Sequence, residues 1–183
     1  PRTLFPYTTL FRSFGQFTAY LSQYLVTTTT AEYTYKVISA VLTTNAVLVI
    51  ALQYVIGRRI SHRYLSQWLI FGLSMFMLGL IGFALSTSVL WWVLAMAVFT
   101  VGEIVVFPAE YMFIDRIAPD HLRGMYYGAQ NLSNLGAALG PVLCGLVLSS
   151  QPAPFMFYML GAFIIGGGVF YFMGARLKAS HPG

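Results

Sequence analysis

Charged side chains are scarce in this chain. Asp, Glu, Lys and Arg make up 8% of the 183 residues, whereas they make up about a quarter of an average soluble domain. So few charges cannot supply the polar surface that a soluble fold of this length needs. Hydrophobic residues make up 58% and recur in long runs along the whole chain. The sequence therefore predicts an integral membrane protein.

Several chemical motifs are also missing. Cys144 is the single cysteine, which excludes an internal disulfide and a cysteine-based metal site. Phosphate-binding glycine loops and HExxH do not occur, and the three histidines fall in loops or in the tail. The net charge of +5 comes from basic residues scattered in short breaks between apolar runs, which argues against nucleic-acid binding. We expect no metal, no cofactor and no enzymatic activity.

The first residues look foreign to the rest of the chain. Residues 3–13 read TLFPYTTLFRS, which resembles a sequencing-library adapter translated in one frame. We therefore leave residues 1–13 out of the fold prediction and expect the natural protein to begin upstream. Under this interpretation residues 14–178 form the transmembrane bundle, and residues 179–183 form a cytoplasmic tail.

Six segments have the length and apolar character of membrane spans, which need about 20 residues each. They lie near 14–30, 37–57, 65–86, 89–114, 122–149 and 154–175. The first is the weakest because it carries many polar side chains. The predicted fold is one all-α bundle of six transmembrane helices in a lipid bilayer.

Basic residues in the connections predict the orientation. One side holds seven of them, namely Arg58, Arg59, Arg63, Arg116, Arg123, Arg176 and Lys178, and the other side holds only Lys36. The positive-inside rule then places the 58–64 loop, the 115–123 loop and the C-terminus in the cytoplasm. The external links are predicted at 31–36, 86–88 and 150–153.

Glu103 is the strongest candidate for a functional residue, because it is an ionisable side chain near the centre of the fourth span. A charge there costs about 2.5 kcal/mol or more on insertion scales, so the side chain should face other helices or a cavity. A carboxyl group in such a place can exchange a proton, as proton-coupled transport requires. The alternative is a protonated Glu that joins two helices by a hydrogen bond. For Glu110, nearer the cytoplasmic interface, we favour hydration or a salt bridge.

Polar side chains in the first two spans form a second set. The first span carries Gln16, Tyr20, Gln23 and Tyr24. Because this polarity is continuous, we favour a cavity-lining role over hydrogen bonds between helices. The second span carries Asn45 and Gln53, eight residues apart on one helix face, and for these we favour packing.

The cytoplasmic loops and the fifth span carry two further patterns. Charges of both signs suggest a gating latch between loops, with ordinary solvated loops as the alternative; the candidates are Arg58, Arg59, Arg63, Asp115, Arg116 and Arg123. Small-residue spacings predict close helix packing and a kink; they involve Gly124, Gly128, Gly136, Gly140, Pro141 and Gly145.

Together these residues resemble the C-terminal six helices of the major facilitator superfamily. Residues 53–63 are similar to its basic loop between helices 8 and 9, although the Asp of that pattern is absent. Residues 102–110 resemble helix 10 of the bacterial drug–proton antiporter branch. Residues 115–145 are similar to the loop 10–11 and helix 11 signature there, which is the most specific match.

The resemblance implies half of a twelve-helix transporter, with inverted three-helix repeats and a substrate site between two bundles. Its first and fourth spans would line the cavity, and the N-terminal bundle would be missing. The implied function is alternating-access transport across the cytoplasmic membrane, as proton-coupled efflux of amphipathic compounds, including drugs. Alternatives are a sugar or peptide symporter or facilitator, and a non-transporting membrane assembly protein.

Overall fold

The computed structural model describes residues 19–131 and 133–179, and all regular secondary structure in these residues is helical. A helical segment at 19–28 precedes a series of labelled helices. These are α2 (Ala31–Gly57), α3 (Leu65–Ala84), α4 (Val89–Ile117), α5 (Arg123–Asn131), α6 (Ser133–Ser150) and α7 (Phe155–Ala179), with short 3-10 turns at His62–Tyr64 and Asp120–Leu122. The predicted all-α class is confirmed.

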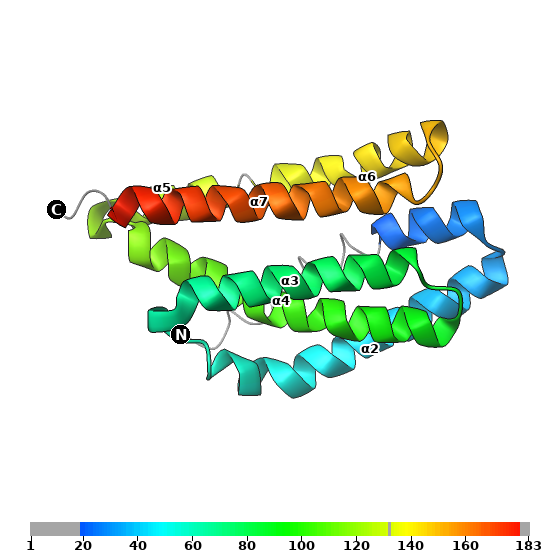
Figure 1. The fold of residues 1–183 in the computed structure, drawn as a ribbon, viewed down its shortest axis with the longest axis horizontal. Coiled ribbons are helices and arrows are strands. Elements are labelled where there is room, and N and C mark those ends of the chain that lie inside the picture. The colour runs from blue at the N-terminus through cyan, green and yellow to red at the C-terminus, as the bar shows by residue number, and fades with distance from the viewer. Residues whose placement is uncertain (1–18, 132, 180–183) are drawn as a thin grey trace.

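The helices lie roughly along one axis of the bundle. In Figure 1, α6 and α7 run along one edge, α2 runs along the opposite edge, and α3 and α4 lie between them. The most extensive contact joins α3 to α4; α2 packs on α4, and α7 packs on α3. Helix α4 is therefore the central element that α2 and α3 share.

Local sequence explains the start of α2 and the end of α4, and the first of these corrects a prediction. Thr30 is extended, and its side chain accepts a hydrogen bond from the Tyr33 amide, so α2 begins at Ala31. The predicted external link at 31–36 is therefore wrong, because those residues form the first turns of α2. At the other end of the bundle, Ala118 is extended and precedes Pro119, which ends α4.

Three of the described helices are long and apolar enough to cross a membrane, namely α2, α3 and α4. Shorter apolar helices at Leu139–Ser150 and Phe155–Val169 follow within the described residues. Many large apolar side chains on these helices are exposed, including Ile50 at 77% and Phe163 at 59%. Such surfaces suit a lipid environment, and the chain is a multi-pass membrane protein.

Glycines bring α3 and α4 into close contact. A Cβ atom placed on Gly79 would lie 2.7 Å from Cβ and 2.9 Å from Cα of Phe99. A Cβ atom on Gly102 would lie 2.9 Å from the carbonyl oxygen of Gly72. Real Cβ atoms do not approach other atoms so closely, so these positions require glycine. We call Gly72, Gly79 and Gly102 the glycine seam.

The glycines of the predicted fifth span, which we expected to pack closely, differ in whether another residue lies against them. A Cβ atom on Gly140 would overlap the Tyr20 hydroxyl, so close packing at Gly140 is observed. At Gly124, Gly128 and Gly145 a Cβ atom would meet no described atom within 4 Å, so the packing expected there is not found within the described part of the chain. Gly136 lies among residues whose side chains are not described. Pro141 lies inside α6.

Two apolar clusters form the core of the described part of the chain. The larger joins the 19–28 segment, α2, α3, α4, α6 and α7, and it includes Phe83, Trp92 and Phe99. The smaller lies toward the 58–64 loop and includes Leu65 and Ala109. On α4, Phe99 belongs to the first cluster and Ala109 to the second, so Glu103 lies between them.

Candidate functional site

The glycine seam sets the rotation of α4. Successive residues of an α-helix point about 100° apart. Because Gly102 lies against Gly72 of α3, Glu103 is directed away from α3 and toward α2. Thr100 is three residues before Glu103 and therefore lies on the same face of α4. Close packing at one residue thus orients the carboxyl group of the next.

Helix α2 presents Asn45 to this face of α4. The buried positions of α2 are Thr34, Val37, Val41, Asn45 and Val49. Their spacing of three or four residues makes a single stripe along the helix. This stripe is apolar around Asn45, so the amide is the polar group of α2 that meets the middle of α4.

Asn45, Thr100 and Glu103 form a buried polar cluster, which we call the carboxyl triad. The Asn45 amide nitrogen donates to Glu103 Oε2 at 2.6 Å and lies 2.9 Å from Thr100 Oγ1. The Thr100 hydroxyl donates to the Met96 carbonyl oxygen at 2.8 Å. The exposed fractions are 2% for Asn45, 0% for Thr100 and 8% for Glu103.

The side chain of Glu103 faces another helix, α2. This is the placement that we expected for a side chain whose charge is costly inside a membrane. Asn45, which we interpreted as a packing residue, is its hydrogen-bond partner. The sequence indicated only weakly that Asn45 and Glu103 would pair, because residue spacing does not predict which faces of α2 and α4 are in contact. An asparagine between Val41 and Val49 in this stripe of α2 was the available sign.

The polar residues of the first span lie elsewhere. Gly140 of α6 lies against the Tyr20 hydroxyl. The Tyr24 ring is 4.8 Å from that of Phe157 and 6.1 Å from that of Trp92, measured between centroids. Tyr20 and Tyr24 therefore pack on the larger apolar cluster, and Gln16 lies outside the described residues.

Gln23 has an unusual environment for an amide. Its Oε1 atom is buried, and it has no hydrogen-bond partner among the described residues. A buried unpaired amide oxygen costs about 1–3 kcal/mol. Within the described chain, no hydrogen bond joins Gln23, Tyr20 or Tyr24 to Glu103, so the cavity candidates fall into two groups on different parts of the bundle.

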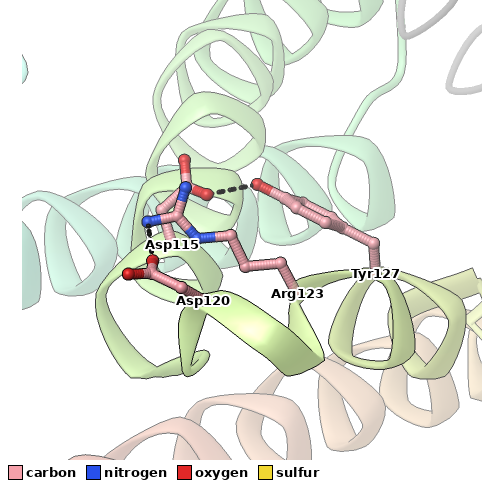
Figure 2. Close-up of polar contacts among 4 residues, drawn as sticks. All are labelled: Asp115, Asp120, Arg123 and Tyr127. Carbon is pink, nitrogen blue, oxygen red and sulfur yellow. Dashed lines mark hydrogen bonds and ion pairs between the residues drawn. The ribbon is translucent and has the colours of Figure 1, made fainter.

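The loop after α4 contains a small polar network (Figure 2). The Tyr127 hydroxyl of α5 donates to Asp115 Oδ1 of α4 at 2.6 Å. Arg123 and Asp120 form an ion pair at 2.9 Å, with both side chains well exposed. The Tyr127 bond links the end of α4 to the middle of α5, whereas the exposed ion pair contributes little stability.

Two arginines of the loop after α2 lie over aromatic rings. Arg58 lies 5.4 Å from the Tyr54 ring centroid, and Arg63 lies 5.5 Å from that of Tyr64. Arg58 and Arg59 also line an open cleft of about 270 Å³ with Tyr54 and Val55. Arg58 contacts a ring near the end of α2, and Arg63 contacts the ring of its sequence neighbour. Neither contact joins the two loops, so a latch between them stays a prediction. Arg116 takes part in further contacts.

Comparison with known proteins agrees with this architecture. Residues 9–182 match the Major Facilitator Superfamily. The chain is 40% identical over 165 residues to the MFS-type transporter YdeE of Escherichia coli, which covers 90% of this chain and 42% of that protein. No solved structure matches the chain.

Two further relatives are similar over shorter stretches. The MFS-type transporter YqjV of Bacillus subtilis is 29% identical over 135 residues, covering 74% of this chain and 33% of that protein. A Na(+), Li(+), K(+)/H(+) antiporter of Planococcus maritimus is 30% identical over 132 residues, covering 68% of this chain and 30% of that protein. The chain thus spans less than half the length of these relatives, and it belongs to the Major Facilitator Superfamily.

Proposed function

We propose that the chain forms the C-terminal six-helix half of a transporter that couples proton entry to export of small amphipathic compounds across the cytoplasmic membrane. The observation that carries this proposal is the buried carboxyl group of Glu103, held by Asn45 at 2.6 Å between two membrane helices. Intramembrane ionisable groups are functional by default because their insertion is costly.

The surroundings of Glu103 support proton exchange. Helix α3 carries no ionisable side chain, and Asn45 and Thr100 supply neutral polar groups that suit either form of the carboxyl. With no described basic side chain paired to it, Glu103 can gain and lose a proton without breaking an ion pair. The relative from Planococcus maritimus is named as a proton antiporter, which agrees with a coupled proton.

The test is Glu103→Gln in the full-length transporter that we propose contains this chain. In inside-out vesicles, substrate addition should release protons from acidified lumens in the wild type, and this proton release should be lost in Glu103→Gln. Glu110→Gln is the matched control, because Glu110 is the other carboxyl group of the same helix region and is partly exposed. Unchanged proton release in Glu103→Gln would refute the role of Glu103.

Exchange of monovalent cations for protons is a second candidate, favoured by the name of that same relative. The oxygens of Thr100 and Glu103 are hard ligands that suit an alkali cation. The same vesicles separate the two functions: for a cation exchanger, Na⁺ or K⁺ alone would release the lumenal protons. Amphipathic compounds alone should do so under our main proposal.

A further inference from the structure

The hydrogens of the carboxyl triad can be assigned one by one. The hydroxyl proton of Thr100 is committed to the Met96 carbonyl oxygen, so Thr100 Oγ1 can only accept from Asn45. The Asn45 nitrogen carries two hydrogens, and Thr100 Oγ1 and Glu103 Oε2 both lie within its reach. The arrangement in the structure therefore presents two donors to two acceptors, which fits an ionised, acceptor-only carboxylate.

A proton on Glu103 Oε2 would change this pattern of donors and acceptors. The carboxyl group would then become a donor, and it would face the amide hydrogens of Asn45, donor against donor. Rotation of the amide by 180° about its last bond would place the Asn45 oxygen at the same position. That oxygen has two lone pairs, so it can accept from Glu103 and from the Thr100 hydroxyl, once the latter rotates away from Met96.

We propose that Asn45 is a positioning residue whose side-chain amide has two orientations, one for ionised and one for protonated Glu103, and so transmits the protonation state of Glu103 from α4 to α2. This inference rests on the proposed function, since it assumes that Glu103 binds the coupled proton. Both orientations keep two hydrogen bonds in the carboxyl triad, so the α2–α4 contact persists while its direction of donation reverses.

Few other titratable groups approach this contact. The ionisable side chains of α2 nearest to Asn45 are Lys36 and Tyr54, each nine residues away, which is about 14 Å along a helix. Helix α3 has none. On α4 the nearest is Glu110, seven residues from Glu103. The 19–28 segment meets the start of α4 through Tyr24 and Trp92. In the described chain Glu103 is thus the group whose ionisation Asn45 senses.

The first test is the pH profile of transport in the full-length protein. Asn45→Leu removes the donor to the ionised carboxylate. Hydrogen bonds to charged groups are about twice as strong as neutral ones, so the half-maximal pH should move to the alkaline side by about one unit. Thr100→Val should move it in the same direction by less. A profile that stays in place in both variants would overturn the inference.

Thr44→Val is the matched control for Thr100→Val. The Thr44 hydroxyl donates to the Ala40 carbonyl oxygen at 2.8 Å, four residues back on its own helix, as Thr100 does on α4. Thr44 lacks a contact with the carboxyl triad among the described hydrogen bonds, so Thr44→Val should leave the profile unchanged. An equal shift in both threonine variants would show a general packing effect and would refute the specific role of Thr100.

The second test detects the amide itself, and the outcome that would refute the inference is read on the wild type. Infrared difference spectra between acid and neutral pH, recorded on wild type with ¹⁵N-labelled asparagine, should show a carboxyl band and an isotope-sensitive amide band together. The part of the carboxyl band that belongs to Glu103 should be lost in Glu103→Gln, and the amide band should vanish in Asn45→Leu. A Glu103 carboxyl band that titrates without an amide band refutes the inference and leaves the proposed function standing. A carboxyl band that is unchanged in Glu103→Gln refutes both.

Discussion

The glycine seam leads to a quantitative prediction for Gly79→Ala. The added Cβ atom would lie 2.7 Å and 2.9 Å from the Cβ and Cα atoms of Phe99, whereas ordinary carbon contacts are about 3.5–4.0 Å. Because Cα belongs to the backbone, a side-chain rotation cannot relieve this overlap. Helices α3 and α4 would have to separate by about 1 Å, with loss of the packing that makes their contact the most extensive in the bundle.

The size of the effect follows from two opposing terms. Overpacking of this kind costs about 1–3 kcal/mol, whereas alanine is favoured over glycine within a helix by about 1 kcal/mol. Gly167→Ala isolates the second term, because a Cβ atom on Gly167 of α7 would meet no described atom within 4 Å. The free energy of unfolding should therefore be lower in Gly79→Ala than in Gly167→Ala by about 1–3 kcal/mol.

The assay is reversible unfolding of the purified full-length protein by titration with a denaturing detergent, followed by circular dichroism. Both variants are compared with wild type under the same conditions, so the helix-propensity term cancels between them. If Gly79→Ala is as stable as Gly167→Ala, then α3 and α4 do not approach each other at this position, and the orientation of Glu103 toward α2 loses its steric basis.

Two further variants probe the ends of the bundle. Gln23→Leu replaces a buried amide oxygen that has no described partner, so the thermal unfolding temperature should be unchanged or higher. A fall in transport by the same variant would identify Gln23 as a substrate contact. A clear loss of stability would show that the oxygen is paired. Tyr127→Phe removes the hydrogen bond to Asp115 and should lower the free energy of unfolding by about 0.5–1.5 kcal/mol. Limited proteolysis between α4 and α5 should become faster, whereas Tyr126→Phe should behave as wild type; equal behaviour of the two tyrosine variants would argue against the link.

Hydropathy predicted the helices because each span is a local property of the chain. The observed bounds of α3 and α4 lie within a few residues of the predicted 65–86 and 89–114. The predicted start of α2 was wrong because Thr30 caps the helix through a single side-chain hydrogen bond. Hydropathy does not take such a local contact into account. The capping residue Thr30 and the acidic first-turn residue Glu32 were present in the sequence, but their polarity led to the prediction of a loop.

Which helices are neighbours was beyond the reach of spacing rules. Small-residue patterns favoured the fifth span, where Gly140 meets the Tyr20 side chain. The closest approach of a glycine to a neighbouring backbone that the structure describes is instead at Gly79 and Gly102, on α3 and α4. A glycine indicates that close approach is possible and does not name the partner. For the same reason Glu103 was identified from its position in an apolar span, but its bond to Asn45 required the relative rotation of two helices.

Gly102 and Glu103 are consecutive residues that contact different helices, α3 and α2 respectively. A turn of α4 large enough to relieve crowding at Gly102 would carry the Glu103 carboxyl through the same angle, because both belong to one rigid helix. The side-chain size tolerated against α3 and the hydrogen bonding available from α2 are therefore mechanically linked. Any change that loosens the seam, even on the far face of α3, alters the direction from which Asn45 meets the carboxyl group.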